Sequence, residues 1–275
     1  METTPTGVLY WNIHQNEKCL AALTELVAER KPGVVMLAEC PFDDVVVLAA
    51  LDSRYRAFSS AHLHVRFYAS AVDFTIENDS LNRLVVARLG SGPTKMLLVG
   101  LHLPSKLFGS SPNNQATAAE EFRRIIREQE QLSGIYRTVI FGDFNMNAYE
   151  WGMVERNRGF RTVPTRQLAL QSIARGSTET RRFYNPMWAW MGDFVAGSAT
   201  AKPAGTYYRS PQNPEDSHWN SLDAVIVSPE AIAHFDVASL EVVTQTAAAQ
   251  HVLFNGAIAA RYSDHLPLHF NLLLS

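Results

Sequence analysis

Thr138-Val-Ile-Phe-Gly-Asp-Phe-Asn145 is an apolar run that ends in a glycine and then places a carboxylate and a carboxamide two positions apart. Residues two apart in a strand point to the same face, so Asp143 and Asn145 are expected to project together. Gly142 is expected to let the backbone approach a ligand closely. Because Gly, Asp and Asn are also common in turns, the stretch alone is equally compatible with an ordinary strand end.

The bulk composition is that of a globular protein. The chain has 275 residues, of which 47% are apolar and 19% charged, enough to form a large hydrophobic core. Its net charge of −3 gives no overall attraction to polyanions, so any nucleic-acid binding must come from a local patch. No repeat or linker interrupts the sequence, and we expect one domain over residues 1–275.

The sequence lacks the features of a secreted or membrane-inserted protein. The first residues, Met1 to Gly7, contain no basic segment followed by an apolar one, so no secretory signal is expected. No apolar run approaches the roughly 18 residues that suggest a membrane span. Cys19 and Cys40 are the only cysteines, and reduced, buried thiols in a cytoplasmic protein are favoured over a disulfide.

Hydrophobic periodicity predicts an opening β-α-β-α unit, followed by a run of strands and then alternating elements. Strands are expected at 8–11, 34–37, 61–68, 71–76, 84–89, 95–103, 138–143, 222–228, 238–243 and 266–274, and helices at 17–30, 42–51, 114–132 and 147–156. The turn-rich stretches 77–80 and 90–93 suggest antiparallel hairpins. Periodicity is lost from about 157 to 219, and so long an irregular segment is usually functional.

Polar residues stand at the ends of these strands. Four apolar strands end in Asn12, in Glu39, in His102 and in the pair Asp143/Asn145, whereas two others begin with Asp223 and with Asp264-His265. The end of one antiparallel strand lies beside the start of its neighbour, so all these groups can meet at one edge. Several carboxylates collected there would repel one another without a cation. Oxygen ligands favour Mg²⁺ or Mn²⁺ over zinc.

In this order the motifs resemble those of the endonuclease/exonuclease/phosphatase superfamily. The resemblance covers nearly the whole chain and rests on Trp11-Asn-Ile13, Leu37-Ala-Glu39, Gly100-Leu-His-Leu103, Gly142-Asp-Phe-Asn145, Leu222-Asp223 and Ser263-Asp-His-Leu266. It implies an α+β fold, a four-layer α/β/β/α sandwich of two mixed, largely antiparallel sheets like that of pancreatic deoxyribonuclease. It also implies a phosphoesterase that depends on Mg²⁺ or Mn²⁺.

The resemblance further implies a role for each residue that matches a motif. Metal ligation would fall to Glu39, with Asn12 as a further ligand or orienting group and Asp264 as a metal-site or water-network carboxylate. The catalytic residues would be His102, Asp143, Asn145, Asp223 and His265. In these roles Asp143 positions or deprotonates water, Asn145 holds water or a phosphate oxygen, and His265, oriented by Asp223, donates to the phosphoryl oxygen. His102 would lie near the phosphate as a possible acid.

Two departures from the family pattern affect loops rather than catalytic groups. Met146-Asn-Ala-Tyr149 follows the glycine motif where a proline is common, and Ser221-Leu222 precedes Asp223 where a basic residue is common. They put local loop geometry and substrate contacts in question.

The irregular segment indicates a possible substrate. Seven arginines and one acidic residue, Glu179, occur from Arg156 to Arg182, a local excess of six positive charges, and several aromatic residues lie near them. Guanidinium groups suit phosphate oxygens and aromatic rings can stack on bases, although such runs are also often solvated surface. The residues expected to bind substrate are Arg158, Arg161, Arg181, Arg182, Tyr207 and Tyr208.

The leading hypothesis is therefore a divalent-metal-dependent phosphodiesterase that hydrolyses nucleic acid or nucleotides by in-line attack of water. One alternative is a phosphomonoesterase or a lipid- or inositol-phosphate phosphoesterase of the same superfamily. A second alternative, from a different class, is a binding module that kept the fold without activity. The complete set of polar groups argues against that last alternative.

Overall fold

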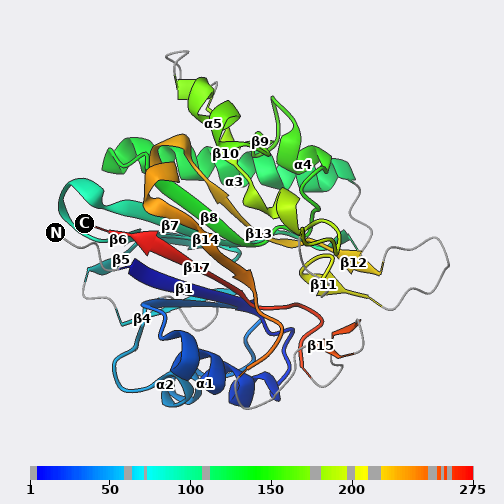
Figure 1. The fold of residues 1–275 in the computed structure, drawn as a ribbon. Coiled ribbons are helices and arrows are strands. Elements are labelled where there is room, and N and C mark those ends of the chain that lie inside the picture. The colour runs from blue at the N-terminus through cyan, green and yellow to red at the C-terminus, as the bar shows by residue number, and fades with distance from the viewer. Residues whose placement is uncertain are drawn as a thin grey trace.

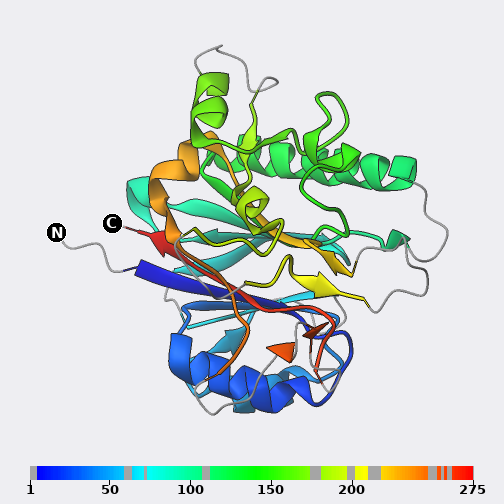
Figure 2. The same cartoon turned by 45° about the vertical axis from the view of Figure 1, so that its right-hand side comes forward.

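Two β-sheets lie face to face, and helices cover both outer faces (Figure 1). The computed structural model describes residues 5–58, 64–70, 73–106, 112–173, 181–196, 202–209, 218–246, 253–254, 257–258 and 262–274. The layer order, helix, sheet, sheet, helix, is seen again after rotation in Figure 2. The α/β/β/α sandwich expected from the sequence is thereby confirmed.

The first sheet contains both ends of the chain. Its order is β14-β17-β1-β2-β4-β3, with β1 (Pro5–Asn12), β2 (Val34–Ala38), β3 (Arg56–Ala57), β4 (Val65–Ala69), β14 (Phe235–Val242) and β17 (Leu268–Leu273). Strand β1 runs parallel to β2 and antiparallel to β17. The helices α1 (Cys19–Arg30) and α2 (Asp44–Leu51) cover its outer face. The predicted β-α-β-α opening is confirmed.

The apolar run Thr138–Asp143 is the central strand of the second sheet. Its order is β5-β6-β7-β8-β13-β10-β9, with β5 (Phe74–Leu81), β6 (Leu84–Leu89), β7 (Met96–His102), β8 (Thr138–Asp143), β9 (Thr162–Val163), β10 (Phe183–Tyr184) and β13 (Asp223–Val227). Only β7–β8 and β9–β10 pair in parallel within it. The helices α3 (Pro112–Ser133), α4 (Trp151–Val154) and α5 (Arg166–Ile173) lie on its outer side.

Short elements complete the fold. Two small hairpins consist of β11 (Tyr207–Tyr208) with β12 (Trp219–Asn220) and of β15 (Leu253–Phe254) with β16 (Ala257–Ile258). Within the part of the chain that the structure describes, 3₁₀ helices cover Gly92–Thr94, Pro186–Trp190 and Pro229–His234. Every described helix is too short or too polar to cross a lipid bilayer.

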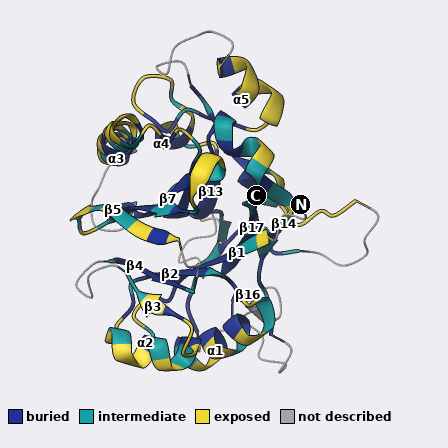
Figure 3. Ribbon diagram, turned by 90° about the vertical axis from the view of Figure 1, so that its left-hand side faces the viewer, coloured by how far each residue is buried: buried dark blue, intermediate teal, exposed yellow. Residues whose placement is uncertain are grey.

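The core fills the space between the sheets. All residues of β2, β7 and β8 are buried, and the burial colouring of Figure 3 shows exposed positions gathered on the outer helices. Phe141 of β8 lies edge-on to Phe67 and Phe270 of the opposite sheet, with ring centroids 5.9 and 5.5 Å apart. Each buried ring contributes about 1.5–3 kcal/mol to folding. This packing fixes how the two sheets meet.

Three local predictions were wrong. The antiparallel hairpins expected from 77–80 and 90–93 are present, since β6 pairs antiparallel with β5 and β7, but the first turn falls after Leu81 because β5 continues through an irregularity at Asn78, whose side chain accepts from Ser80. The helix expected at 147–156 is limited to α4 because the side chain of Asn147 bonds to the 220–221 segment instead. The segment 157–219 contains short elements, β9, α5, β10, β11 and β12, too brief to produce a periodic pattern.

The cysteines are both buried and both free. Burial raises the pKa of the Cys19 thiol to about 12 and also raises the pKa of Cys40. Both side chains therefore act as small apolar residues of the layer beneath α1.

Candidate active site

Alternate residues of β1 carry polar groups into the space between the sheets. Tyr10 and Asn12 share one face of the strand because they lie two positions apart. The Tyr10 hydroxyl donates to Asp223 Oδ1 at 2.8 Å, and the Asn12 amide donates to Asp143 Oδ2 at 3.1 Å. Since both partners belong to the second sheet, the polar rim is built by two facing sheets rather than by the edge of one.

Three neighbouring strands of the second sheet bring their polar ends together. His102 pairs across β7–β8 with Asp143, and Asp143 pairs across β8–β13 with Asp223. The parallel strands β7 and β8 both end here, whereas the antiparallel strand β13 begins here. This is the convergence of strand ends and strand starts that the sequence predicts.

A carboxylate cluster forms where the two sheets meet. His102 Nε2 lies 3.4 Å from Glu39 Oε1 and 3.6 Å from Asp143 Oδ2. The amide nitrogen of Asn12 lies 3.3 Å from Glu39 Oε1. Glu39, His102 and Asp143 each offer one possible ligand atom. These three atoms lie within 4.8 Å of one another, close enough to hold a metal ion.

Unusual backbone conformations accompany these residues. Glu39 and Asn145 have φ values of 50° and 51°, in the left-handed region that costs a residue with a side chain roughly 1–2 kcal/mol. Such strain is common at functional sites. Gly142 has a φ of 139°, and a Cβ there would lie 2.0 Å from the Leu101 carbonyl oxygen. The glycine is required by the close packing of β7 on β8, and the expectation that it admits a ligand was wrong.

His265 is held from both sides by hydrogen bonds. Its Nδ1 lies 2.8 Å from Asp223 Oδ2. Its backbone amide donates to Ser263 Oγ at 3.0 Å, and Ser263 in turn donates to the Asn12 carbonyl at 2.6 Å. The free side of the ring, Nε2, lies 3.9 Å from Asp143 Oδ2 and faces the carboxylate cluster. The family resemblance implied the Asp223–His265 pair, and the structure brings the two residues together.

Burial and the neighbouring charges shift the protonation of these groups. Burial by itself lowers the pKa of His265, but the carboxylates of Asp223, Asp143 and Asp264 outweigh it and raise the pKa to about 10. Burial raises the pKa of the Asp143 carboxyl to about 7, although the His265 charge opposes that change. Burial also lowers the pKa of His102 to about 3, so its imidazole is neutral near pH 7.

Asn145 secures the loop that follows β8. Its backbone amide donates to Asp143 Oδ1 at 2.8 Å, and its side-chain amide donates to the Leu103 carbonyl at 2.8 Å. Gln115 of α3 donates to the Asn145 carbonyl at 2.9 Å. The backbone amide of Asn145 thus fixes the orientation of the Asp143 carboxylate, and its carboxamide ties the loop to the end of β7.

Asp264 lies beside His265, at the same ring nitrogen that faces this cluster. Its Oδ1 is 3.8 Å from His265 Nε2 and 3.7 Å from His14 Nδ1, and it has no hydrogen-bond partner among the described residues. His14 Nδ1 also lies 3.8 Å from Glu39 Oε2. His14 therefore stands between the two predicted metal-binding carboxylates, and the sequence analysis did not include it.

A pocket of about 490 Å³ opens over these groups. Seven residues with a predicted role line it, namely Glu39, His102, Asp143, Asn145, Tyr207, Asp264 and His265. Asn12 and Asp223 are fully buried behind them. The lining also includes three basic residues without a predicted role, His14, Lys106 and Arg209. His14 follows Asn12 by two residues, a spacing that could have drawn attention to it, whereas no motif surrounds Lys106 or Arg209.

Of the residues predicted to bind substrate, only Tyr207 lines this pocket. Its ring packs on His265 with centroids 4.7 Å apart. Tyr208 points elsewhere, packing on Trp219 at 5.2 Å. The side chains of Arg158, Arg161 and Arg182 are absent from the lining.

The prediction that Arg181 binds substrate was wrong. Its guanidinium is buried and forms two hydrogen bonds with the carboxylate of Glu130 in α3, one of them at 3.0 Å. The ring of Phe183 lies 5.3 Å away beneath it. A buried charge requires a buried partner, so Arg181 joins α3 to the edge of the second sheet. Sequence alone could not distinguish this arginine from its exposed neighbours.

Comparison with known proteins finds similarity at the level of structure. No protein-family model matches the sequence, and no curated protein matches it significantly. The endonuclease domain of TRAS1, a telomere-specific non-LTR retrotransposon, aligns over 98% of this chain and 100% of its own, with 16% identity and a TM-score of 0.54. TDP2 of D. rerio, complexed with single-strand DNA product, aligns over 98% and 100%, with 14% identity and a TM-score of 0.58.

A third solved structure carries a family description. An endonuclease/exonuclease/phosphatase family protein from Bacteroides thetaiotaomicron aligns over 100% of this chain and 96% of its own, with 11% identity and a TM-score of 0.58. At such identities the matches show the fold alone. What the site does must be argued from its residues.

Proposed function

We propose that this chain, which has the endonuclease/exonuclease/phosphatase fold, is a divalent-metal-dependent phosphodiesterase acting on nucleic acid or nucleotides. The observation that carries the proposal is one pocket in which Glu39 and Asp143 face His265, itself bonded to Asp223. An acid, a base and a cation-binding group stand within reach of one substrate atom, as phosphodiester hydrolysis requires.

The donor set suits a hard divalent cation. Glu39 and Asp143 offer carboxylate oxygens, and the amide of Asn12 can present its oxygen instead of its nitrogen by rotation about its last side-chain bond. Oxygen-rich sites favour Mg²⁺ or Mn²⁺. A buried carboxyl whose pKa has risen to about 7, as for Asp143, is one that a cation would stabilise in its ionised form. When bound, the metal would neutralise charge developing on the phosphoryl oxygens.

Asp143 and His265 have complementary proton affinities. Asp143 suits the role of base toward water because its carboxylate lines the pocket and lies 3.9 Å from His265 Nε2. His265, with a pKa of about 10, is charged and can donate from Nε2 to a phosphoryl oxygen. Asp223 and the hydroxyl of Tyr10 hold that imidazolium in place.

His102 and Asp264 occupy supporting positions. The low pKa of His102 disfavours the acid role that the family resemblance implies. We assign His102 a positioning role beside the carboxylates of Glu39 and Asp143, which lie 3.4 and 3.6 Å from its Nε2. Asp264, beside His14 and His265, would order water at the pocket wall.

The pocket wall favours a nucleotide over an uncharged substrate. Arg209 provides positive charge and the Tyr207 ring provides a stacking surface, whereas the ammonium of Lys106 forms an ion pair with Glu150. TDP2 of D. rerio was solved with a single-strand DNA product, and the TRAS1 domain is an endonuclease. These neighbours make nucleic acid the first substrate to test.

The test uses a generic phosphodiester, bis-p-nitrophenyl phosphate, with Mg²⁺ or Mn²⁺ and with chelator. Turnover should require the metal and stop on chelation. Asp143→Asn should lower kcat by about 10²- to 10⁴-fold because it removes the base, while the exposed control Asp79→Asn should behave as wild type. Turnover without metal, or an Asp143→Asn rate close to wild type in a folded protein, would contradict the proposal.

A further inference from the structure

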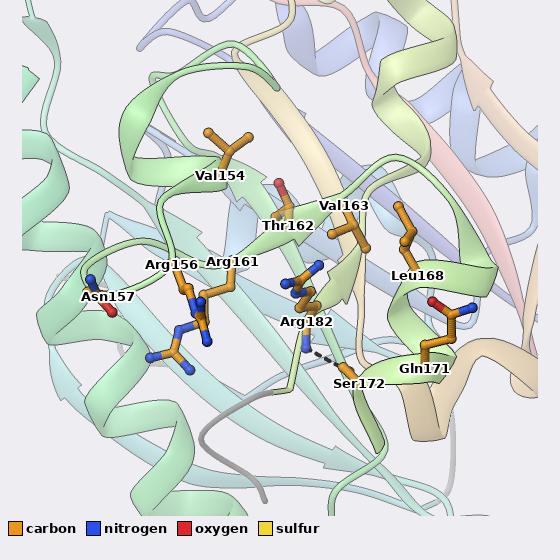
Figure 4. A pocket seen from close by; sticks show the side chains of 10 residues that line it. All are labelled: Val154, Arg156, Asn157, Arg161, Thr162, Val163, Leu168, Gln171, Ser172 and Arg182. Atoms are coloured by element: carbon orange, nitrogen blue, oxygen red, sulfur yellow. Dashed lines mark hydrogen bonds between the residues drawn. The ribbon is translucent and has the colours of Figure 1, made fainter. Parts of the chain in front are cut away.

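A second cavity of about 460 Å³ lies at the opposite edge of the second sheet from β5, between α4, β9 and α5 (Figure 4). It shares no lining residue with the active-site pocket. The two cavities are of similar size, and both fall within the range of roughly 300–1,000 Å³ that is usual for small-molecule sites. The edge of the sheet therefore offers a separate binding space.

Three arginines line this cavity: Arg156, Arg161 and Arg182. Figure 4 shows Arg156 and Arg161 toward one end, Arg182 in the middle, and apolar Val163 and Leu168 toward the other end. No carboxylate is found among the described lining residues. The wall thus has one strongly positive end and one apolar end.

A further arginine, Arg123 of α3, lies next to the loop that carries Arg161. Arg123 of α3 donates to the Gly159 carbonyl at 3.0 Å and so holds the loop that carries Arg158 and Arg161. Burial lowers the pKa of the Arg123 guanidinium to about 10, and the charges of Arg161, Arg127 and Arg181 act in the same direction. An anion bound near Arg123 would oppose this lowering of its pKa.

The backbone of the cavity is held in a defined geometry. Arg161 has a φ of 57°, in the left-handed region, and strained residues of this kind cluster at ligand sites. The Arg182 amide donates to the buried Ser172 hydroxyl at 3.1 Å. The hydroxyl of Thr162, a residue of the lining, is buried and has no hydrogen-bond partner among the described residues.

We propose that this cavity, which we call the arginine pocket (Arg156, Arg161 and Arg182), binds the phosphate group of a nucleotide, apart from the catalytic site. Guanidinium forks match phosphate oxygens and hold them by paired charged hydrogen bonds. The apolar end, Val163 and Leu168, provides a surface for the base. The phosphate can belong to a free nucleotide or to a nucleic-acid strand, since both present the same group.

Calorimetric titration in chelator tests this without any hydrolysis, so the result is independent of the proposed activity. The ligands are AMP and a short oligodeoxythymidine. The test protein carries Arg156→Gln and Arg182→Gln, both solvent-accessible side chains. The matched control carries Arg54→Gln and Arg88→Gln, which remove the same charge from α2's following loop and from β6. If the test protein fails to fold, the single variant of exposed Arg156 replaces it.

We expect the test protein to bind AMP at least about tenfold more weakly than wild type and the control to bind normally, because charged hydrogen bonds to phosphate are lost. Replacing the basic side chains of the active-site pocket, by Lys106→Gln with Arg209→Gln, should leave AMP binding at the arginine pocket in place. Much tighter oligonucleotide than AMP binding would identify a strand as the source of the phosphate, and equal binding would identify a free nucleotide. Equal affinity of test and control proteins for both ligands, or no binding by wild type, would overturn the proposal.

Discussion

Asp223→Asn should uncouple His265 from catalysis without disturbing the fold. Asp223 is fully buried, and its two oxygens contact His265 Nδ1 and the Tyr10 hydroxyl. The substitution keeps the size of the side chain and removes its charge. A carboxamide oxygen can still accept from Nδ1–H, but it no longer stabilises a charged ring. The neutral ring then carries a lone pair on Nε2 and cannot donate a proton there.

The structure sets the size of the effect. The pKa of His265 is about 10 against an ordinary 6.5, and each pKa unit corresponds to about 1.4 kcal/mol. The folded environment as a whole, burial included, therefore favours the imidazolium by roughly 5 kcal/mol relative to water. With Asp223 removed, burial lowers the pKa of His265 again. We expect kcat for bis-p-nitrophenyl phosphate to fall by about 10²- to 10⁴-fold, the usual range for one acid or base.

Two readouts separate this effect from misfolding. His265 ring signals followed by NMR should titrate at much lower pH in Asp223→Asn than in wild type. Tyr10→Phe is the graded control, because it removes the other bond to Asp223 and leaves the His265 bond intact; its kcat should fall by less than tenfold. A folded Asp223→Asn protein with kcat within a few-fold of wild type, or with an unchanged His265 titration, would refute the assigned role.

Stability should show the same linkage. The folded pKa of His265 lies above its unfolded value, so its contribution is complete below about pH 6.5 and disappears as pH rises through 10. The pKa of Asp143 is also higher in the folded protein, so its contribution to stability decreases as the pH rises from about 4 to 7. In chelator, the Tm of wild type should therefore decrease from neutral to alkaline pH. Asp223→Asn should flatten the alkaline part of that decrease, and a parallel decrease would contradict the His265 assignment.

Three further outcomes are expected. Mg²⁺ at about 100 times its Kd should raise the unfolding free energy of wild type by about 2.7 kcal/mol, and Glu39→Gln should abolish that gain in thermal scans; equal stabilisation of both proteins would place the ion elsewhere. Gly142→Ala should prevent stable folding, because its Cβ would overlap a β7 carbonyl, whereas Gly134→Ala, where nothing lies within 4 Å, should cost only about 1 kcal/mol in urea unfolding; similar costs would refute the packing argument. Arg181→Gln should cost about 3–5 kcal/mol of stability, whereas Arg124→Gln, in an exposed ion pair, should cost at most about 1 kcal/mol; an equally stable Arg181→Gln protein would show that the buried pair is unimportant.

The order of elements and the positions of the polar strand ends could be predicted from the sequence. Runs such as Val34–Ala38 are apolar throughout, because strands covered on both sides have no polar face, and that pattern is local. The amphipathic stripe of α3 is likewise local. Asn12, Glu39, His102 and Asp143 stand out because each interrupts an apolar run. Their roles in metal binding and catalysis stay predictions until they are tested.

Only the tertiary structure shows which of these strands belong to which of the two facing sheets. No local pattern shows that Tyr10 reaches across to Asp223, since the two are 213 residues apart. The same holds for the arginines of the irregular segment. Arg181 and Arg182 are neighbours in the chain, yet one is buried against Glu130 and the other lines a cavity. Burial depends on which distant residues pack around a side chain, so two adjacent residues just before β10 can differ in burial. The sequence by itself therefore determined which chemical groups the protein possesses and the strands that carry them, and only the packing of one sheet on the other decided which of those groups meet.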